Sequence, residues 1–209
     1  MARVSLPASV QQFFFAAVFT ATMWIVGRVG TAELAAANVL VNLMLVAILP
    51  GMAMGMAAAS FVGRSLGQGA REAARLWAWD VVKVAAAVMV SLGVPLVLVP
   101  EAILGVFLTD PETLALAKWP LRISGATMLF DAVGMVLMNA LTGAGATRTV
   151  MTVSISVQWL LFLPAAFLVG PTLGHGLLGI WICHMLWRAV QAAAFTSLWQ
   201  RGRWAYVRV

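Results

Sequence analysis

The stretch that decides the fold is LRISGATMLFDAVGMVLMNALTG, which occupies residues 121–143. Apolar and small residues dominate it, and an α-helix of about 20 such residues crosses the roughly 30 Å of hydrocarbon in a bilayer. Beyond Arg122, its one ionisable side chain is Asp131, near the middle of the run. The stretch therefore predicts a membrane-spanning helix that carries a carboxylate at membrane depth.

The composition of the whole chain agrees with a membrane protein. Of the 209 residues, 63% are hydrophobic and only 10% are charged, whereas a typical soluble domain has about 25% charged residues. Mean hydropathy is +0.98. These values exclude a soluble enzyme, and the single cysteine, Cys183, excludes an intrachain disulfide scaffold. We predict an all-α integral membrane protein.

Apolar runs of spanning length occur six times in the chain. We predict spans at about residues 8–26, 31–62, 76–99, 112–141, 150–169 and 177–200. Residues 1–209 then form a single six-helix transmembrane lobe. Pro50 lies inside the second span, where we prefer one bent helix to two short ones because the apolar sequence resumes directly after it.

Orientation follows from the basic residues between the spans, because cytoplasmic loops are enriched in Lys and Arg. One side carries most of them: Arg3, Arg64, Arg71, Arg75, Lys83, Arg148, Arg201, Arg203 and Arg208. We predict a multi-pass protein of the plasma or inner membrane with both termini in the cytoplasm. The net charge of +6 is then explained by topology and lipid headgroups, not by nucleic acid, and residues 201–206 form an interfacial anchor.

Asp131 is the strongest candidate for a functional residue. A carboxylate at the centre of a membrane costs at least about 2.5–3.5 kcal/mol, so it needs a polar cavity, a partner or a proton. No partner is evident nearby in the sequence, and we predict an unpaired carboxylate that binds a proton or a cation beside a water-filled cavity. The alternative is a carboxylic acid that hydrogen-bonds to a neighbouring helix and serves packing alone.

Other polar side chains also lie at membrane depth. Each of them alone is typical of a hydrogen bond between helices. Together with Asp131 they indicate a wet interior cavity, and the residues that we expect to line or support it are Asn38, Asn42, Asn139, Gln158 and His184.

Small residues recur every four positions in the second span, at Gly51, Gly55, Ala59 and Gly63. Such a stripe lets a second helix approach closely, and we assign it to helix packing. Searches for catalytic residues fail: the chain has no nucleophile elbow, no zinc-protease motif and no cluster of metal-ligand residues, so we predict neither an enzyme nor a bound cofactor.

Several motifs resemble those of the multidrug and toxic compound extrusion (MATE) family, in particular of its C-terminal six-helix lobe. The matching segments are Leu6-Pro7, Gly30-Thr31, 34–38, Asn42, Pro50-Gly51-Met52, Gly55, 57–58, VGRSLGQG at 62–69, Phe130-Asp131-Ala132 and LTGAGATR at 141–148. Their order covers nearly the whole chain.

The resemblance implies a secondary antiporter that exports drugs or other toxic organic compounds and is driven by inward Na⁺ or H⁺ flow. It implies a substrate cavity between two six-helix lobes, and it matches Asp131 to an acid that some sodium-coupled members use. This chain departs from those members at three positions: Phe15 replaces a Glu, and Thr142 and Ala146 replace an Arg and an Asp. The coupling ion, H⁺ or Na⁺, therefore stays open.

The partners implied are a small organic substrate, the lipid bilayer and a second six-helix lobe, which is either a missing N-terminal half or a homodimer mate. We therefore expect a fragment or a half-size subunit. Two alternatives remain: a lipid-linked oligosaccharide flippase of the same superfamily, with Arg122 and Arg188 on a pyrophosphate, and a membrane assembly subunit that does not transport.

Overall fold

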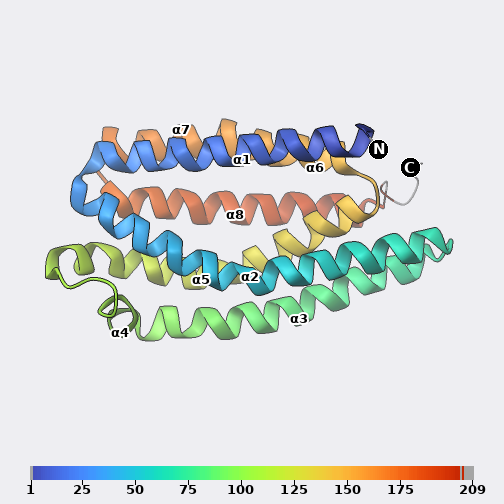
Figure 1. The fold of residues 1–209 in the computed structure, drawn as a ribbon, viewed down its shortest axis with the longest axis horizontal. Helices are drawn as coiled ribbons and strands as arrows, with labels where there is room; N and C mark the ends of the chain where they lie inside the picture. Colours follow the sequence, from blue (N-terminus) through green and yellow to red (C-terminus); the bar gives the residue numbers. More distant parts are fainter. Residues whose placement is uncertain (1, 203, 205–209) are drawn as a thin grey trace.

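The structure is a bundle of long α-helices (Figure 1). This computed structural model describes residues 2–202 and 204, with side chains at residues 10, 12–202 and 204. Arg3, Arg203, Arg208 and part of the predicted anchor at 201–206 therefore lie outside the described side chains. The elements in chain order are α1 (Ala2–Val29), α2 (Thr31–Gly67), α3 (Arg71–Leu98), α4 (Pro100–Leu104), α5 (Pro111–Gly143), α6 (Thr147–Ser156), η1 (Val157–Phe162), α7 (Leu163–Phe167), η2 (Leu168–Thr172) and α8 (Gly176–Gln200).

The described residues contain six candidate membrane spans, since α6 to η2 form one helical segment over Thr147–Thr172. The predicted all-α membrane class is confirmed. The largest differences from the predicted bounds are at α1, which begins at Ala2 and not near residue 8, at α2, which ends at Gly67 and not near residue 62, and at α3, which begins at Arg71 and not near residue 76. The short helix α4 was not predicted. Pro100 opens α4, and a five-residue helix is too short to produce a periodic apolar signal.

Helix α5 lies at the centre of the bundle. It packs against α2, α3 and α8, whereas α1 packs against α2 and lies beside α6, α7 and η2 in the upper layer of Figure 1. Helix α2 is one continuous helix with Pro50 inside it, and it changes direction near its middle (Figure 1). The preference for a bent helix is thus confirmed, because one missing N–H kinks a helix without ending it when apolar packing continues on both sides.

The small-residue stripe of α2 lies against α5 and α3. A Cβ on Gly51 would come within 2.6 Å of Met89 Sδ on α3, and a Cβ on Gly55 would come within 2.6 Å of Asn139 Nδ2 on α5. At the end of the stripe, a Cβ on Gly143 of α5 would lie 2.7 Å from Ala59 Cα. The two backbones touch here, and only glycine fits.

The fifth span is not a regular α-helix. The N–H of Leu163 donates to the carbonyl of Gln158, and the N–H of Leu173 donates to that of Leu168, which are π-type bonds between residues five apart. Pro164 and Pro171 lie in the same segment and lack the N–H that an α-helix uses at those positions. The π turns rotate the residues that follow, so the face that η1 presents could not be obtained from α-helical periodicity.

Two glycines in the left-handed region end the central helices at one end of the bundle. Gly69 (φ 74°) follows α2 and Gly145 (φ 83°) follows α5. In both turns the next residue donates to a carbonyl five residues back, Ala70 to Ser65 and Ala146 to Leu141, as in a Schellman cap. A side chain at either glycine would be strained, so these tight turns depend on glycine.

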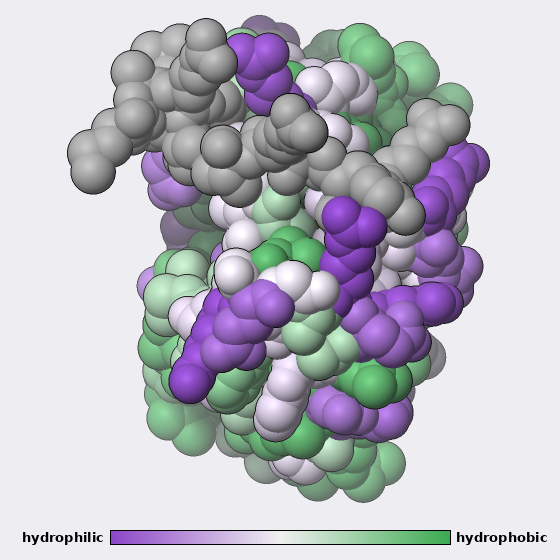
Figure 2. Space-filling model, turned by 90° about the vertical axis from the view of Figure 1, so that its right-hand side faces the viewer, coloured by the Kyte–Doolittle hydropathy of each residue, from purple (hydrophilic) through white to green (hydrophobic). Residues whose placement is uncertain are grey.

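Basic residues gather at this same end, where α1 also begins and α8 ends (Figures 1 and 2). Figure 2 shows hydrophilic side chains across that end of the molecule. Its exposed arginines are Arg64, Arg71, Arg75, Arg148 and Arg201. The opposite end carries the acids Glu33, Glu101, Asp110 and Glu112. The tertiary structure therefore collects the charges that the sequence assigned to two sides.

Candidate functional site

Asp131 lies in the buried middle of α5 and is paired with an arginine. Arg188 of α8 donates through Nε to Asp131 Oδ1, and the carboxylate is fully buried. The expectation of an unpaired carboxylate is therefore wrong. The physical reason is that the two residues lie at the same level of the bundle. Asp131 and Arg188 each lie twelve residues before the last residue of their helix, Gly143 and Gln200, and α5 and α8 run in the same direction (Figure 1).

The guanidinium of Arg188 has two further contacts. Its Nη1 donates to Gln191 Oε1 at 3.0 Å, and its Cζ lies 5.3 Å from the ring centroid of Trp187. The second carboxylate oxygen, Asp131 Oδ2, is buried and has no hydrogen-bond partner among the described residues. The site is thus a closed charge pair between α5 and α8 with one free acceptor.

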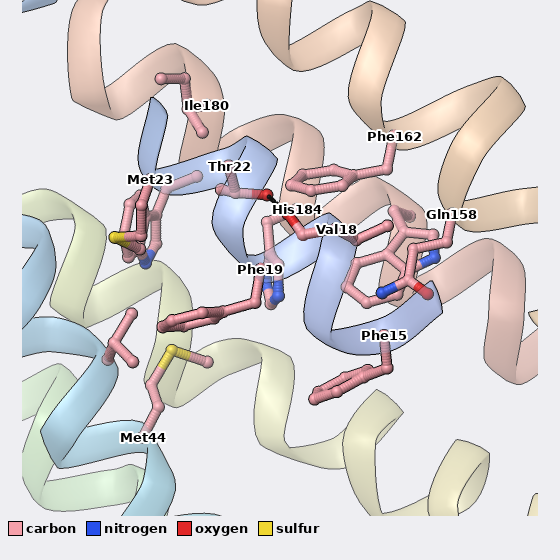
Figure 3. Close-up of a pocket in the computed structure, with 13 residues that line it drawn as sticks. Phe15, Val18, Phe19, Thr22, Met23, Met44, Gln158, Phe162, Ile180 and His184 are labelled. Carbon is pink, nitrogen blue, oxygen red and sulfur yellow. Dashed lines mark hydrogen bonds between the residues drawn. The ribbon is translucent and has the colours of Figure 1, made fainter. Parts of the chain in front are cut away.

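An apolar pocket opens between α1, α2, η1 and α8 (Figure 3). Its volume is about 120 Å³. Aromatic rings and methionines make most of its wall, and the complete lining is Phe15, Val18, Phe19, Thr22, Met23, Val41, Met44, Gln158, Phe162, Ile180, Trp181, His184 and Trp187. Asp131 is not among these residues.

Two of the polar residues predicted from the sequence line this pocket. Gln158 reaches it from the π-helical η1, and His184 reaches it from α8 (Figure 3). The His184 ring packs edge-on against Phe162 and Trp187, at centroid distances of 5.8 and 5.0 Å. Among the described residues, neither the Gln158 amide nor the His184 imidazole has a hydrogen-bond partner. Both are therefore available to a ligand.

Trp187 connects the pocket to the charge pair. Its ring forms part of the pocket wall and lies 5.1 Å from the Phe162 ring, while the Arg188 guanidinium lies near the same indole. A ligand that displaces Trp187 therefore also changes the surroundings of Arg188. The i, i+4 spacing of His184 and Arg188 places both on one side of α8, as predicted.

A second link between helices was missed in the sequence. Trp181 of α8 donates through Nε1 to Ser124 Oγ of α5 at 3.0 Å, and Ser124 donates to the Pro120 carbonyl at 2.9 Å. Ser124 Oγ also lies 3.4 Å from Met44 Sδ of α2. The sequence does show a serine in a spanning helix, and such serines commonly form hydrogen bonds between helices. Which of the nine tryptophans is its partner could not be predicted.

The three predicted asparagines do not line the pocket. Each amide donates to the carbonyl four residues earlier on its own helix, from Asn38 to Leu34, from Asn42 to Asn38 and from Asn139 to Met135. Asn38 and Asn42 are exposed on α2, and Asn139 packs against Gly55. A role for them in a cavity of this lobe alone has no geometric basis.

Arg122 and Arg188 do not meet either. Arg122 lies nine residues before Asp131 on α5, which is about 13 Å along the helix axis. Its guanidinium lies 5.0 Å from the Trp119 ring, close to the ion pair of Lys118 with Glu101. In residues 2–202 and 204, no three His, Cys, Asp or Glu side chains gather as a metal site.

These features define the class: a polytopic α-helical membrane protein with an aromatic pocket beside an internal charge pair. The MatE family model matches residues 7–168, and the chain belongs to this family, the MATE transporters. The family membership predicted from the sequence is confirmed.

Curated relatives resemble the chain over nearly its whole length. The probable multidrug resistance protein NorM of Brucella suis biovar 1 is 26% identical over 204 residues, which are 95% of this chain and 43% of the relative. The multidrug resistance protein MdtK of Yersinia pestis (strain Pestoides F) is 27% identical over 207 residues, 96% of this chain and 44% of the relative. The chain therefore spans less than half the length of these relatives.

Solved structures show the same fold. A MATE crystal structure in the straight conformation superposes with a TM-score of 0.89 at 18% identity, covering 96% of this chain and 45% of that one. A MOP superfamily transporter from Pyrococcus furiosus superposes with a TM-score of 0.79 at 20% identity, covering 93% and 43%. The chain thus has the fold of one lobe of a two-lobe transporter.

Proposed function

We propose that the chain is one lobe of a secondary active antiporter that exports drugs or other toxic organic compounds. Membership of the MatE family carries this proposal, and the names of the NorM and MdtK relatives support it. The aromatic pocket beside the Asp131–Arg188 pair supplies the chemistry: a surface for an organic molecule next to an ionisable group.

The pocket suits flat, largely apolar compounds, including organic cations. Aromatic faces attract cations through their quadrupoles, and methionine side chains adapt to ligands of different shape. Gln158 and His184 add neutral hydrogen-bonding groups, which orient a ligand without fixing its charge. Asp131 is the candidate ion-coupling residue, and its occupancy by a coupling ion would require it to leave Arg188.

The working transporter needs a second six-helix lobe, either an N-terminal half or a second copy. Exposed aromatic residues of α1 and exposed asparagines of α2 favour this face as the one turned toward the other lobe: Phe13, Phe15, Phe19, Asn38 and Asn42. With the arginine-rich end in the cytoplasm, both chain termini face the cytoplasm of a plasma or inner membrane.

Extrusion of ethidium tests the proposal. The chain is produced together with its second lobe in cells that lack their own efflux pumps, and ethidium loss is followed by fluorescence after an ion gradient is imposed. We expect extrusion with the wild-type pair and none with Asp131→Asn. Asp80→Asn, which changes an exposed acid on α3, is the matched control and should extrude normally.

Two results would contradict the proposal. Absence of ethidium extrusion and of ethidium binding by the wild-type pair would favour a non-transporting assembly subunit. Normal extrusion by Asp131→Asn would remove Asp131 from coupling. A lipid-linked oligosaccharide flippase is not favoured, because Arg188 is engaged by Asp131 and Arg122 lies about 13 Å from Asp131 along the axis of α5.

A further inference from the structure

The contacts of Arg188 concern the ion specificity of the lobe. Arg188 supplies a positive charge in direct contact with Asp131, at the position where a free cation would approach this carboxylate. We propose that Arg188 is a tethered cation that occupies Asp131 and excludes monovalent metal ions, so that this residue determines which ions the lobe accepts. This inference rests on the proposed function only in taking Asp131 as the ion-coupling residue.

The first argument concerns ligand atoms. Hard cations bind oxygen atoms, several at a time. Arg188 uses two of the oxygens that the site offers, Asp131 Oδ1 through Nε and Gln191 Oε1 through Nη1. Asp131 Oδ2 is the one remaining carboxylate oxygen, and a single oxygen in a buried site cannot replace the hydration shell of Na⁺.

The second argument concerns charge. The Asp131 carboxylate is fully buried and the Arg188 side chain is nearly so, and together they are neutral. Adding Na⁺ to this pair would leave one uncompensated positive charge in a low-dielectric interior, which is strongly unfavourable.

The third argument concerns position. The guanidinium is held on two sides besides the carboxylate, by the Gln191 amide oxygen at 3.0 Å and by the Trp187 ring at 5.3 Å. Helices α5 and α8 are in contact beside it, since a Cβ on Gly134 would lie at an ordinary van der Waals distance of 3.7 Å from Ala192 Cα. A metal ion would therefore have to displace a side chain that three groups and two packed helices keep in place.

Thermal unfolding of the purified 209-residue chain in detergent tests the inference, with NaCl compared against choline chloride at equal ionic strength. Wild type should unfold at the same temperature in both salts. Arg188→Met frees Asp131 Oδ1 and Gln191 Oε1, so that together with Asp131 Oδ2 three oxygens become available, and we expect Na⁺ to raise its unfolding temperature by about 2–4 °C. Asp131→Asn combined with Arg188→Met should lose this rise, and Arg148→Met, at an exposed arginine of α6, should show none.

Arg188→Gln serves as a second neutral variant if Arg188→Met does not fold. Binding of radioactive Na⁺ to the wild-type chain, measured by equilibrium dialysis, keeps the test decisive in either case. Wild-type Na⁺ binding that Asp131→Asn abolishes would overturn the inference, and so would folded Arg188 variants that gain no response to Na⁺. These measurements do not involve ethidium, so the inference and the proposed transport function fail separately.

Discussion

Helices α5 and α1 are both long and apolar, but they differ sharply in how much of each is buried. In α5, 56% of an 18-residue apolar stretch is buried within the lobe, whereas in α1 only 17% of the corresponding stretch, Gln12–Val29, is buried. Helix α5 contacts α2, α3 and α8, while α1 leaves Phe13, Phe15 and Trp24 exposed. The difference indicates that α5 is the fixed scaffold of the lobe and that α1 offers a surface to lipid, ligand or a second lobe.

The polar groups follow the same division. On the α5 side, Asp131 and Ser124 are bonded to partners on α8. On the α1 side, Gln158 and His184 face the pocket without such partners. Polar side chains between tightly packed helices are used for cohesion, and those beside α1 remain free for recognition. Substitutions that affect the two sides unequally would sharpen this comparison.

The largest effect is expected at the buried charge pair of α5 and α8. Arg188→Met leaves the Asp131 carboxylate without its partner, and breaking a buried pair in this way costs about 3–5 kcal/mol. The free energy of unfolding can be measured by titrating the chain in mild detergent with sodium dodecyl sulfate. Lys83→Gln breaks an exposed pair with Asp80 and should cost about 1 kcal/mol or less. Equal losses in the two variants would refute a structural role for the buried pair.

The next effect is expected where α2 and α5 touch. Gly143→Ala places a Cβ against the Ala59 backbone, which cannot move as a flexible side chain can, and overpacking of this kind costs about 1–3 kcal/mol. The same detergent titration measures it. Gly67→Ala, at the end of α2 with nothing within 4 Å, should be neutral or slightly stabilising. An unchanged free energy of unfolding in Gly143→Ala would mean that α2 and α5 can move apart at this contact with little loss of stability.

A smaller effect is expected at the boundary between scaffold and pocket. Trp181→Phe removes the donor to Ser124 and should cost about 1 kcal/mol of stability. Because Trp181 also lines the pocket, ethidium binding, measured by fluorescence, should weaken as well. Trp119→Phe changes an exposed tryptophan of α5 and should alter neither quantity. Unchanged ethidium binding in Trp181→Phe would place the ligand elsewhere.

The smallest effect is expected at the first turn of α5, outside the membrane-spanning part. The hydroxyl and backbone N–H of Thr113 both donate to Asp110 and hold its pKa below the usual value for aspartate. A lowered pKa stabilises the fold fully above the unfolded pKa of about 3.9, and this contribution is lost as pH falls through the lower folded value.

Acid titration of the unfolding free energy checks this prediction at α5. The loss of stability below about pH 4 should be weaker in Asp110→Asn, which caps the helix without titrating. Glu112→Gln, two residues after Asp110 in the first turn of α5, is the control and should keep the wild-type acid response. A pH response that Asp110→Asn leaves unchanged would remove the cap as its source.

Much of the fold could be predicted from the sequence because a bilayer accepts few structures. Apolar runs of spanning length predicted the six helices, and the continuous apolar sequence around Pro50 predicted a single bent helix. The π turns at Gln158 and Leu168 escaped prediction, because their bonds depend on how proline-containing turns adjust to the neighbouring helices. The start of α3 at Arg71 was missed because its first turn is charged, and α4 was missed because five residues give no periodic apolar signal.

Prediction of the candidate site was less complete. Hydropathy singled out Asp131, and residue type singled out Gln158 and His184. The pairing of Asp131 with Arg188 was not predicted, although the two residues lie equally far from the ends of their helices. The asparagines were predicted to line the cavity from residue type and helical spacing, and in the structure their amides bond to their own helices.

By itself the sequence determined a membrane protein of six helices, because hydrophobic length and the distribution of charge act on each segment independently. Only the tertiary structure decided that Asp131 meets Arg188 and that the pocket forms between α1, α2, η1 and α8. Which helix faces align depends on rotations about each axis, and those rotations are set by close packing at residues such as Gly143 and Ala59.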